Sequence, residues 1–288
     1  MRGRAEGESV PAGGTHENDE PASGAREGVA PARPQGWYAR LAKLLEPVFL
    51  ACVPVALIAC AYFQFDQTAL LTFAVAVAAL ALFFAGWEAS RPALRQVMPA
   101  AVLGALAAAG RILFAPIPDF KPVSAICILA GAVFGRRCGF MVGALAALVS
   151  NFFFGQGAWT PWQMYAWGMV GYLAGVLFGE RERSSEGWGG KRGRSERERE
   201  RKARATDRKT PVLVCVYGFV SAFFYGLLLN TWTLVGFVHP ITWEAAVLTF
   251  GAALPFDATH AVATVLFLLV IYVPWRKKLE RIKVKYGM

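Results

Sequence analysis

Long apolar runs separated by short polar loops dominate the chain. Helices are the expected element, because backbone groups in lipid must be hydrogen-bonded within their own segment, and no period-two alternation typical of strands occurs. A membrane-spanning helix needs about 20 residues, and most of the runs approach that length. The pattern predicts eight apolar segments, over residues 47–63, 69–87, 97–114, 122–135, 138–154, 162–179, 211–236 and 243–273.

Two of these segments depart from the usual length of a span. Segment 122–135 is short, and segment 243–273 is too long for one simple crossing. Because proline disrupts a helix interior, Pro255 is expected to divide the last segment. We therefore predict a short outer or re-entrant helix over 243–253 and a true span over 256–273.

Composition supports a membrane protein. The 288 residues are 56% hydrophobic, and the polar ones concentrate in two stretches. A net charge of +10 in a soluble protein would suggest nucleic-acid binding, but here the basic residues lie in loops between apolar runs. The five cysteines form no CxxC pair, so we expect no disulfide and no metal site. Residues 1–46 are predicted to be a disordered cytoplasmic tail and not a signal peptide.

Basic residues mark alternate loops. The charged 180–210 loop alone holds twelve Lys or Arg against seven acidic residues, whereas the intervening loops 64–68, 115–121, 155–161 and 237–242 hold only Lys121. The positive-inside rule then predicts eight spans in the cell membrane, with both termini and the basic tail 276–288 in the cytoplasm. The other basic residues on the predicted cytoplasmic side are Arg33, Arg40, Lys43, Arg91, Arg95, Arg136, Arg137, Arg276, Lys277 and Lys278.

The 180–210 loop allows two interpretations. Its ERERERK run (196–202) suits a solvated, partly helical linker with charge pairs four residues apart. Alternatively, it binds a cytoplasmic partner.

Enzymatic signatures are missing from the sequence. It contains no GxxxxGK[ST] phosphate loop, no HExxH zinc motif and no GxSxG nucleophile elbow, and only three histidines, His16, His239 and His260. We therefore expect no catalytic activity and no cofactor.

Three ionisable residues stand where the charge rule does not place them. Arg111 lies near the outer end of the third segment, and Asp257 and His260 lie one turn apart near the outer start of the last span. Ionisable groups at membrane depth are costly and often functional. The alternative is an Arg111–Asp257 ion pair that only tethers two helices. Asn151 and Asn230, each near an outer helix end, are either interhelical hydrogen-bonding residues or ligand contacts.

An aromatic outer loop, residues 152–167, reads FFFGQGAWTPWQMYAW. Tryptophan and tyrosine at a membrane interface commonly form a belt. Yet Gln156, Trp159 and Trp162 place amide and ring surfaces together, which suits capture of a flat or ring-bearing small molecule.

Small residues recur every four positions in the third segment. Such faces let helices approach closely, either inside this chain or against a membrane partner. One row is Ala100, Gly104 and Ala108, and the next is Ala101, Ala105 and Ala109.

Three longer stretches carry a family resemblance: GRILFAPIPDFKPVSAICILAGAVFG (110–135), GALAALVSNFFFGQGAWTPWQMYAWGMVGYLAG (143–175) and LPFDATHAVATVLFLL (254–269). Together they resemble the substrate-binding S component of energy-coupling factor (ECF) vitamin transporters. The resemblance implies an all-α integral membrane fold, with a six-helix core over 97–275 preceded by two additional transmembrane helices over 47–88. Those two helices and the 180–210 loop depart from the compact family core.

The resemblance also implies a function. S components are not enzymes: they bind a vitamin or related micronutrient from the outer side and dock on a transmembrane coupling protein carried by two ATPases. An alanine-rich face of the first core helix makes that contact, which here matches Ala101, Ala105 and Ala109 with Gly104 and Ala108 beside them. A cobalamin-like or other ring-bearing vitamin is compatible with the Trp-rich loop. The alternatives are an ion-coupled secondary transporter with Asp257 and His260 as a proton relay, and a membrane scaffold.

Overall fold

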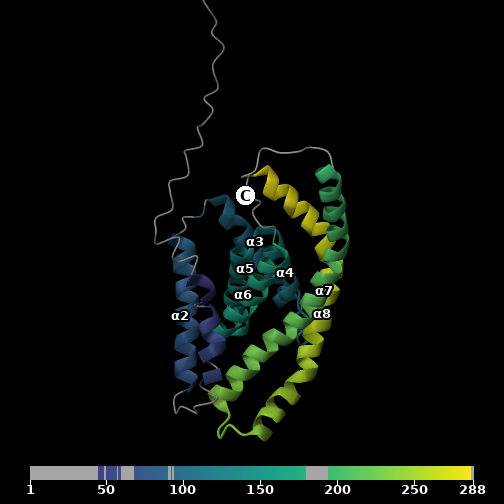
Figure 1. Ribbon diagram of the computed structural model, residues 1–288. Coiled ribbons are helices and arrows are strands. Elements are labelled where there is room, and N and C mark those ends of the chain that lie inside the picture. Colours follow the sequence, from purple (N-terminus) through teal and green to yellow (C-terminus); the bar gives the residue numbers. More distant parts are fainter. Residues whose placement is uncertain are drawn as a thin grey trace, which may run out of the picture. The chain divides into compact units, whose positions relative to one another are not determined.

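A computed structural model describes residues 45–48, 50–56, 58–59, 68–89, 92, 94–179 and 194–286. Most of the predicted tail and the first part of the charged loop, 180–193, lie outside the described residues. The regular structure in the described part is helical (Figure 1). A short apolar helix, Leu45–Ala56, precedes α2 (Thr68–Ala89), α3 (Leu94–Leu113), α4 (Val123–Phe134), α5 (Arg136–Phe154), α6 (Trp159–Phe178), α7 (Arg194–Phe237) and α8 (Trp243–Lys285).

Four helical segments in the described part are long and apolar enough to cross a membrane. They are α3, α5, the Pro211–Phe237 part of α7, and α8. Leu45–Ala56, Phe73–Glu88 of α2 and α4 are apolar but shorter. The predicted all-α membrane fold is confirmed, and the charged segment from Arg194 onward is helical, continuous with the span that follows Pro211.

The last predicted segment is one helix, not two. α8 runs without a break from Trp243 to Lys285, so the prediction of a separate helix over 243–253 is wrong. A proline removes only one backbone hydrogen bond, and intact turns on both sides keep the helix going. The side chain of Thr242 caps the first turn by accepting from the N–H of Ala245 at 3.2 Å. The hydroxyl of Thr259 donates to the carbonyl of Pro255 at 2.9 Å, next to the interruption.

A single glycine joins α4 to α5. Gly135 has φ 90° and ψ 170°, a backbone conformation that other residues rarely adopt, so the chain turns between two helices without a longer loop. Arg136 and Arg137, which the sequence placed in an interhelical loop, therefore form the first turn of α5.

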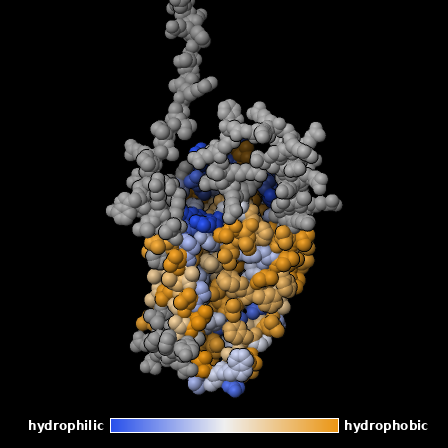
Figure 2. All heavy atoms as spheres, viewed as in Figure 1, coloured by the Kyte–Doolittle hydropathy of each residue, from blue (hydrophilic) through white to orange (hydrophobic). Residues whose placement is uncertain are grey.

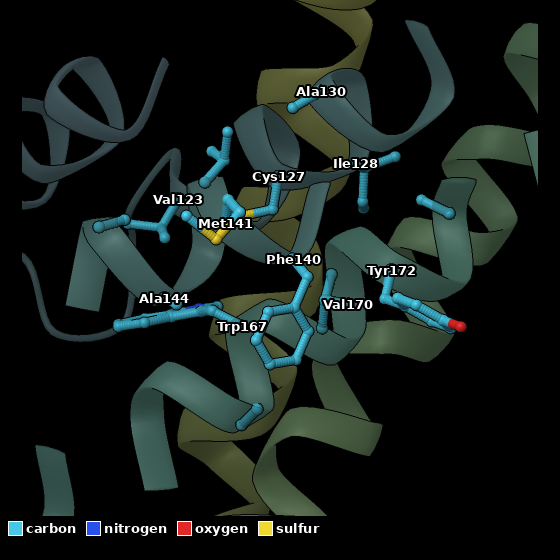
Figure 3. Packing of buried hydrophobic residues seen from close by; sticks show 14 of the residues in the cluster. Val123, Cys127, Ile128, Ala130, Phe140, Met141, Ala144, Trp167, Val170 and Tyr172 are labelled. Atoms are coloured by element: carbon cyan, nitrogen blue, oxygen red, sulfur yellow. The ribbon is translucent and has the colours of Figure 1, made fainter. Parts of the chain in front are cut away.

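The short helix α4 lies at the centre of the packing. Every residue from Val123 to Val133 is buried, and α4 packs against α3, α5, α6 and α8. At about 1.5 Å per residue its 12 residues span about 18 Å, which suffices because protein, and not lipid, surrounds it. Figure 3 shows this core, including Val123, Cys127, Ile128, Phe140, Met141, Ala144, Trp167, Val170 and Tyr172.

Glycines allow α5 and α6 to pack backbone against backbone. A Cβ atom on Gly171 of α6 would collide with the backbone of Gly139, and one on Gly139 would collide with that of Gly171. A Cβ on Gly143 would likewise strike the backbone of Trp167. Small residues at such spacing permit close helix contact in membranes. Because only the glycine faces allow this approach, the contact fixes which side of α5 faces α6.

The two ends of the helices differ in chemistry. At what we call the basic end, Lys283 donates to the carbonyl of Val133 at 3.0 Å, and Arg137 lies 2.5 Å from the carboxylate of Glu46. The opposite end, called here the site end, comprises the ends of α3, α5 and α7 and the starts of α4, α6 and α8. Figure 2 shows apolar side chains along the middle of the helices and hydrophilic ones gathered where α8 finishes.

The N-terminal helices pack directly on the core. The hydroxyl of Tyr165 in α6 donates to the backbone carbonyl of Leu50 at 2.5 Å. α2 packs against α6 and α7, and its Phe83 lies with its ring centroid 3.9 Å from that of Phe140 in α5. The described helices before α3 thus contact α5, α6 and α7.

Candidate functional site

A buried polar cluster joins three helices at the site end. Arg111, at the end of α3, donates from Nη1 to the hydroxyl of Ser150 and to Oδ1 of Asn151, both at 2.6 Å. Asn151 is fully buried, and its Nδ2 donates to Thr160 at 3.0 Å and to Gln163 at 2.9 Å, both in α6. We call these five residues the Arg111 cluster. They hold a cation with neutral oxygens instead of a carboxylate.

Aromatic rings flank the guanidinium. Cζ of Arg111 lies 4.7 Å from the ring centroid of Phe154 and 4.9 Å from that of Trp167, distances at which a cation is attracted to an aromatic face. Trp167 also stacks on Tyr225 of α7, with centroids 4.9 Å apart and an interplanar angle of 26°. A ring stack therefore runs from Arg111 toward α7 and α8.

His260 lies at the end of this stack. It is 7% exposed, its Nε2 is 2.7 Å from the hydroxyl of Ser124 at the start of α4, and Tyr225 meets its ring edge-on at a centroid distance of 5.1 Å. Ring contacts thus connect Arg111 on α3 with His260 on α8 through α6 and α7.

Asp257 belongs to a separate branch of the site. Its carboxylate accepts from Nδ2 of Asn230 at 3.3 Å and lies directly against Gly226, where any Cβ would collide with it. Among the described residues, Arg111 bonds to Ser150 and Asn151, and no ion pair joins it to Asp257. The alternative of an Arg111–Asp257 tether is therefore wrong. Arg111 of α3 bonds to residues of α5, and Asp257 of α8 bonds to a residue of α7.

The residues of the aromatic loop separate into two groups. Trp162 is 1% exposed and stacks on Trp232 of α7, with centroids 6.0 Å apart, so it is a core residue near the site and not a belt residue. Trp159 is 43% exposed and its ring lies over Gly157. Gln156 is exposed and fixes the turn, because its side chain donates to the carbonyl of Leu148 and accepts from the hydroxyl of Thr160.

A second cation approaches the cluster from the loop between α3 and α4. Burial, the largest cause, lowers the pKa of the Lys121 ammonium; Asp119 partly offsets this, and the Arg111 cation adds to the lowering. Arg111 and Lys121 are thus within electrostatic range of each other, with Asp119 as the acid near both. The site end therefore concentrates positive charge on the side formed by α3.

Several residues of this arrangement were not predicted from the sequence: Ser124, Ser150, Gln163, Trp167, Tyr225 and Trp232. Ser150 precedes Asn151 in the chain, and Gln163 and Trp167 lie within the aromatic loop, so their positions carried a usable signal. Ser124, Tyr225 and Trp232 had none, because isolated polar or aromatic residues in apolar runs are common.

The arrangement offers hydrogen-bonding groups and ring faces, which are means of recognition. No group of three or more His, Cys, Asp or Glu side chains able to hold a metal ion occurs in the described ranges. Asp257 and His260 are one turn apart, yet each bonds a different partner, Asn230 and Ser124.

The small residues of α3 divide between two faces. Gly104 and Ala108 are buried, and a Cβ on Gly104 would lie 2.9 Å from Cβ of Leu145 in α5. Internal packing therefore explains these two. Ala101, Ala105 and Ala109 are exposed and form the row that a membrane partner can reach.

Comparison with known proteins identifies a family. Residues 95–275 match the family model described as ECF transporter, substrate-specific component. No curated protein and no solved structure matches the chain. Because the match covers more than half of the chain and all of α4, α5 and α6, the chain belongs to the family of substrate-specific components of ECF transporters, which are membrane transport proteins that act on small-molecule substrates.

Proposed function

We propose that this S component binds a vitamin or related micronutrient at its site end, from outside the cell, and delivers it inward. The coupling protein and two ATPases that the family resemblance implies would supply the energy. The observation that carries the proposal is the Arg111 cluster: a buried cation, held by neutral groups and flanked by aromatic rings, at the end away from the basic residues. A buried charge of this kind is costly, and ionisable groups at membrane depth commonly mark functional sites.

The orientation follows from the charges. Arg95, Arg136, Arg137 and Lys283 lie at the basic end, which the positive-inside rule assigns to the cytoplasm. The site end then faces outward, and both termini are cytoplasmic. The proposed substrate-binding residues are Arg111, Asn151, Gln156, Trp159, Trp162, Asn230, Asp257 and His260.

We assign the partner surface to α3. The exposed row of Ala101, Ala105 and Ala109 offers the close approach that small side chains allow. The proton-relay alternative finds less support, since Asp257 and His260 are bonded to separate partners.

The test begins with the protein purified in mild detergent. Mass spectrometry of small molecules that co-purify, followed by equilibrium binding of a vitamin panel, should reveal one tightly bound compound. Replacing buried Trp162 by alanine should weaken that binding, whereas the matched change at Trp243, which is 79% exposed, should not.

Transport in cells supplies the second half of the test. Uptake of the bound compound should stop when the ATPases are inactivated and survive collapse of the proton gradient. The proposal is wrong if no vitamin binds and uptake is unchanged in variants of Arg111, Trp162 and Asp257.

A further inference from the structure

The Arg111 guanidinium has one edge committed and one edge open. Nη1 carries two hydrogens, and both are used, by Ser150 and Asn151. No described residue accepts a hydrogen bond from Nε or Nη2, although the residue is only 9% exposed. These two nitrogens point their N–H groups in parallel, and that fork matches the two oxygens of a carboxylate.

The charge around this edge is only partly compensated, because Asp119 is the one described acid that acts on both cations and it forms no ion pair with either. Arg111 and Lys121 interact with each other as like charges, and no described acid lies within ion-pair distance of either one. Asp119 is within electrostatic range but outside ion-pair contact. Two cations brought together in a partly desolvated place are stabilised by an anion that binds between or beside them.

The Asp257 branch of the site offers hydrogen-bond acceptors, whereas the Arg111 branch offers donors. The Asp257 carboxylate receives a single hydrogen bond, 3.3 Å long, from Asn230. An ionised carboxylate offers about four acceptor positions, so Asp257 has capacity for further N–H donors. Trp167, over which the Arg111 guanidinium lies, stacks on Tyr225, and Tyr225 directly precedes Gly226, the residue against the Asp257 carboxylate.

From this juxtaposition we propose that the substrate is a planar molecule with a carboxylate at one end, which the Nε–Nη2 edge of Arg111 holds in a bidentate pair, and an N–H donor at the other end, which Asp257 accepts. The inference rests on the proposed function and narrows it to acid-bearing vitamins. A carboxylate fits better than a neutral carbonyl because both nitrogens of the open edge and the Lys121 charge are then used.

The experiment compares acids with their primary amides. The wild-type protein in detergent is titrated with nicotinate, biotin, pantothenate, lipoate and folate, with the amide of each, and with thiamine, riboflavin and pyridoxine as vitamins without a carboxylate. We expect the tightest binder to be an acid that also carries an N–H donor, as folate, biotin and pantothenate do and nicotinate and lipoate do not. Its amide should bind at least about tenfold more weakly, the loss typical of a charge-assisted hydrogen-bonded pair.

Two variants assign the effect to residues. Arg111→Lys keeps the charge but not the fork, so the acid-to-amide affinity ratio should fall toward one. Asp257→Asn should weaken the acid and its amide alike, because it acts at the other end. Arg95→Lys, at the basic end, is the control and should leave both affinities within about twofold of wild type, since that site is distant.

The outcomes separate the two proposals. If thiamine, riboflavin or pyridoxine binds tightest, or if acid and amide bind equally to the wild-type protein, the carboxylate inference is wrong while the transport function stands. If Arg111→Lys weakens acid and amide by the same factor, Arg111 is structural and the inference also fails. If nothing in the panel binds and nothing co-purifies, the proposed function itself fails. Should Arg111→Lys not fold, the wild-type comparison still decides.

Discussion

Replacing Asn151 by leucine should strongly destabilise the protein. Asn151 is fully buried and makes three interhelical hydrogen bonds, with Arg111 at 2.6 Å, Thr160 at 3.0 Å and Gln163 at 2.9 Å. The bond to the Arg111 cation is worth about 1.5–3 kcal/mol and each neutral bond about 0.5–1 kcal/mol in a membrane protein. Leucine has a similar volume but no polar group, so the expected loss is about 2.5–5 kcal/mol of unfolding free energy.

The assay is equilibrium unfolding in mixed micelles, followed by tryptophan fluorescence. Asn230→Leu is the matched control, because Asn230 is half-buried and makes one bond of 3.3 Å, so its loss should stay below about 1 kcal/mol. Asn151→Asp should fall between them, since it keeps an acceptor for Arg111 but loses both donated bonds. Equal unfolding free energies for Asn151→Leu and Asn230→Leu would refute the reasoning, because the Arg111 cluster would then not stabilise the fold.

Three further predictions use other parts of the fold. Gly171→Ala should cost about 1–3 kcal/mol, because its Cβ would collide with backbone, whereas Gly251→Ala, with open space around it, should be neutral or slightly stabilising by the same unfolding assay. Glu46→Gln should cost about 2–3 kcal/mol and expose the N-terminal helices to limited proteolysis, while the more exposed ion-pair partner Arg136 should tolerate glutamine with a loss below about 1 kcal/mol; equal losses would contradict this. Ala105→Leu should leave substrate binding unchanged and abolish uptake; unchanged uptake would remove the partner assignment to α3.

Much of the fold was predictable, because lipid leaves so few choices. Apolar run length and loop charge suffice to place the helices and to group the basic loops at one end, and contacts such as Lys283 with Val133 agree with that grouping. Local exceptions were harder. The continuity of α8 through Pro255 and the one-residue joint at Gly135 depend on how neighbouring turns compensate, which a rule about one residue does not capture.

Several residues of the site were predicted from the sequence, but the hydrogen bonds between them were not. Arg111 and Asn151 were both singled out, but not as partners, because 40 positions separate them and their meeting depends on how α3 and α5 are rotated. That rotation is fixed by packing, such as that of Gly104 against Leu145, which a list of polar residues does not contain. An ion pair between Asp257 and Arg111 was one of two alternatives drawn from their charges, yet Asn230, on the helix beside Asp257, is its hydrogen-bonded neighbour.

The placement of the additional helices bears on how the transporter assembles. The segment Leu45–Ala56 is held at α5 and α6 by Glu46 and by the bond from Tyr165 to Leu50, and α2 packs on α6 and α7. α3 instead packs on α4 and α5 through its buried row and keeps Ala101, Ala105 and Ala109 exposed. The described helices before α3 therefore pack on α5, α6 and α7 and leave exposed the row of α3 to which we assign the coupling protein.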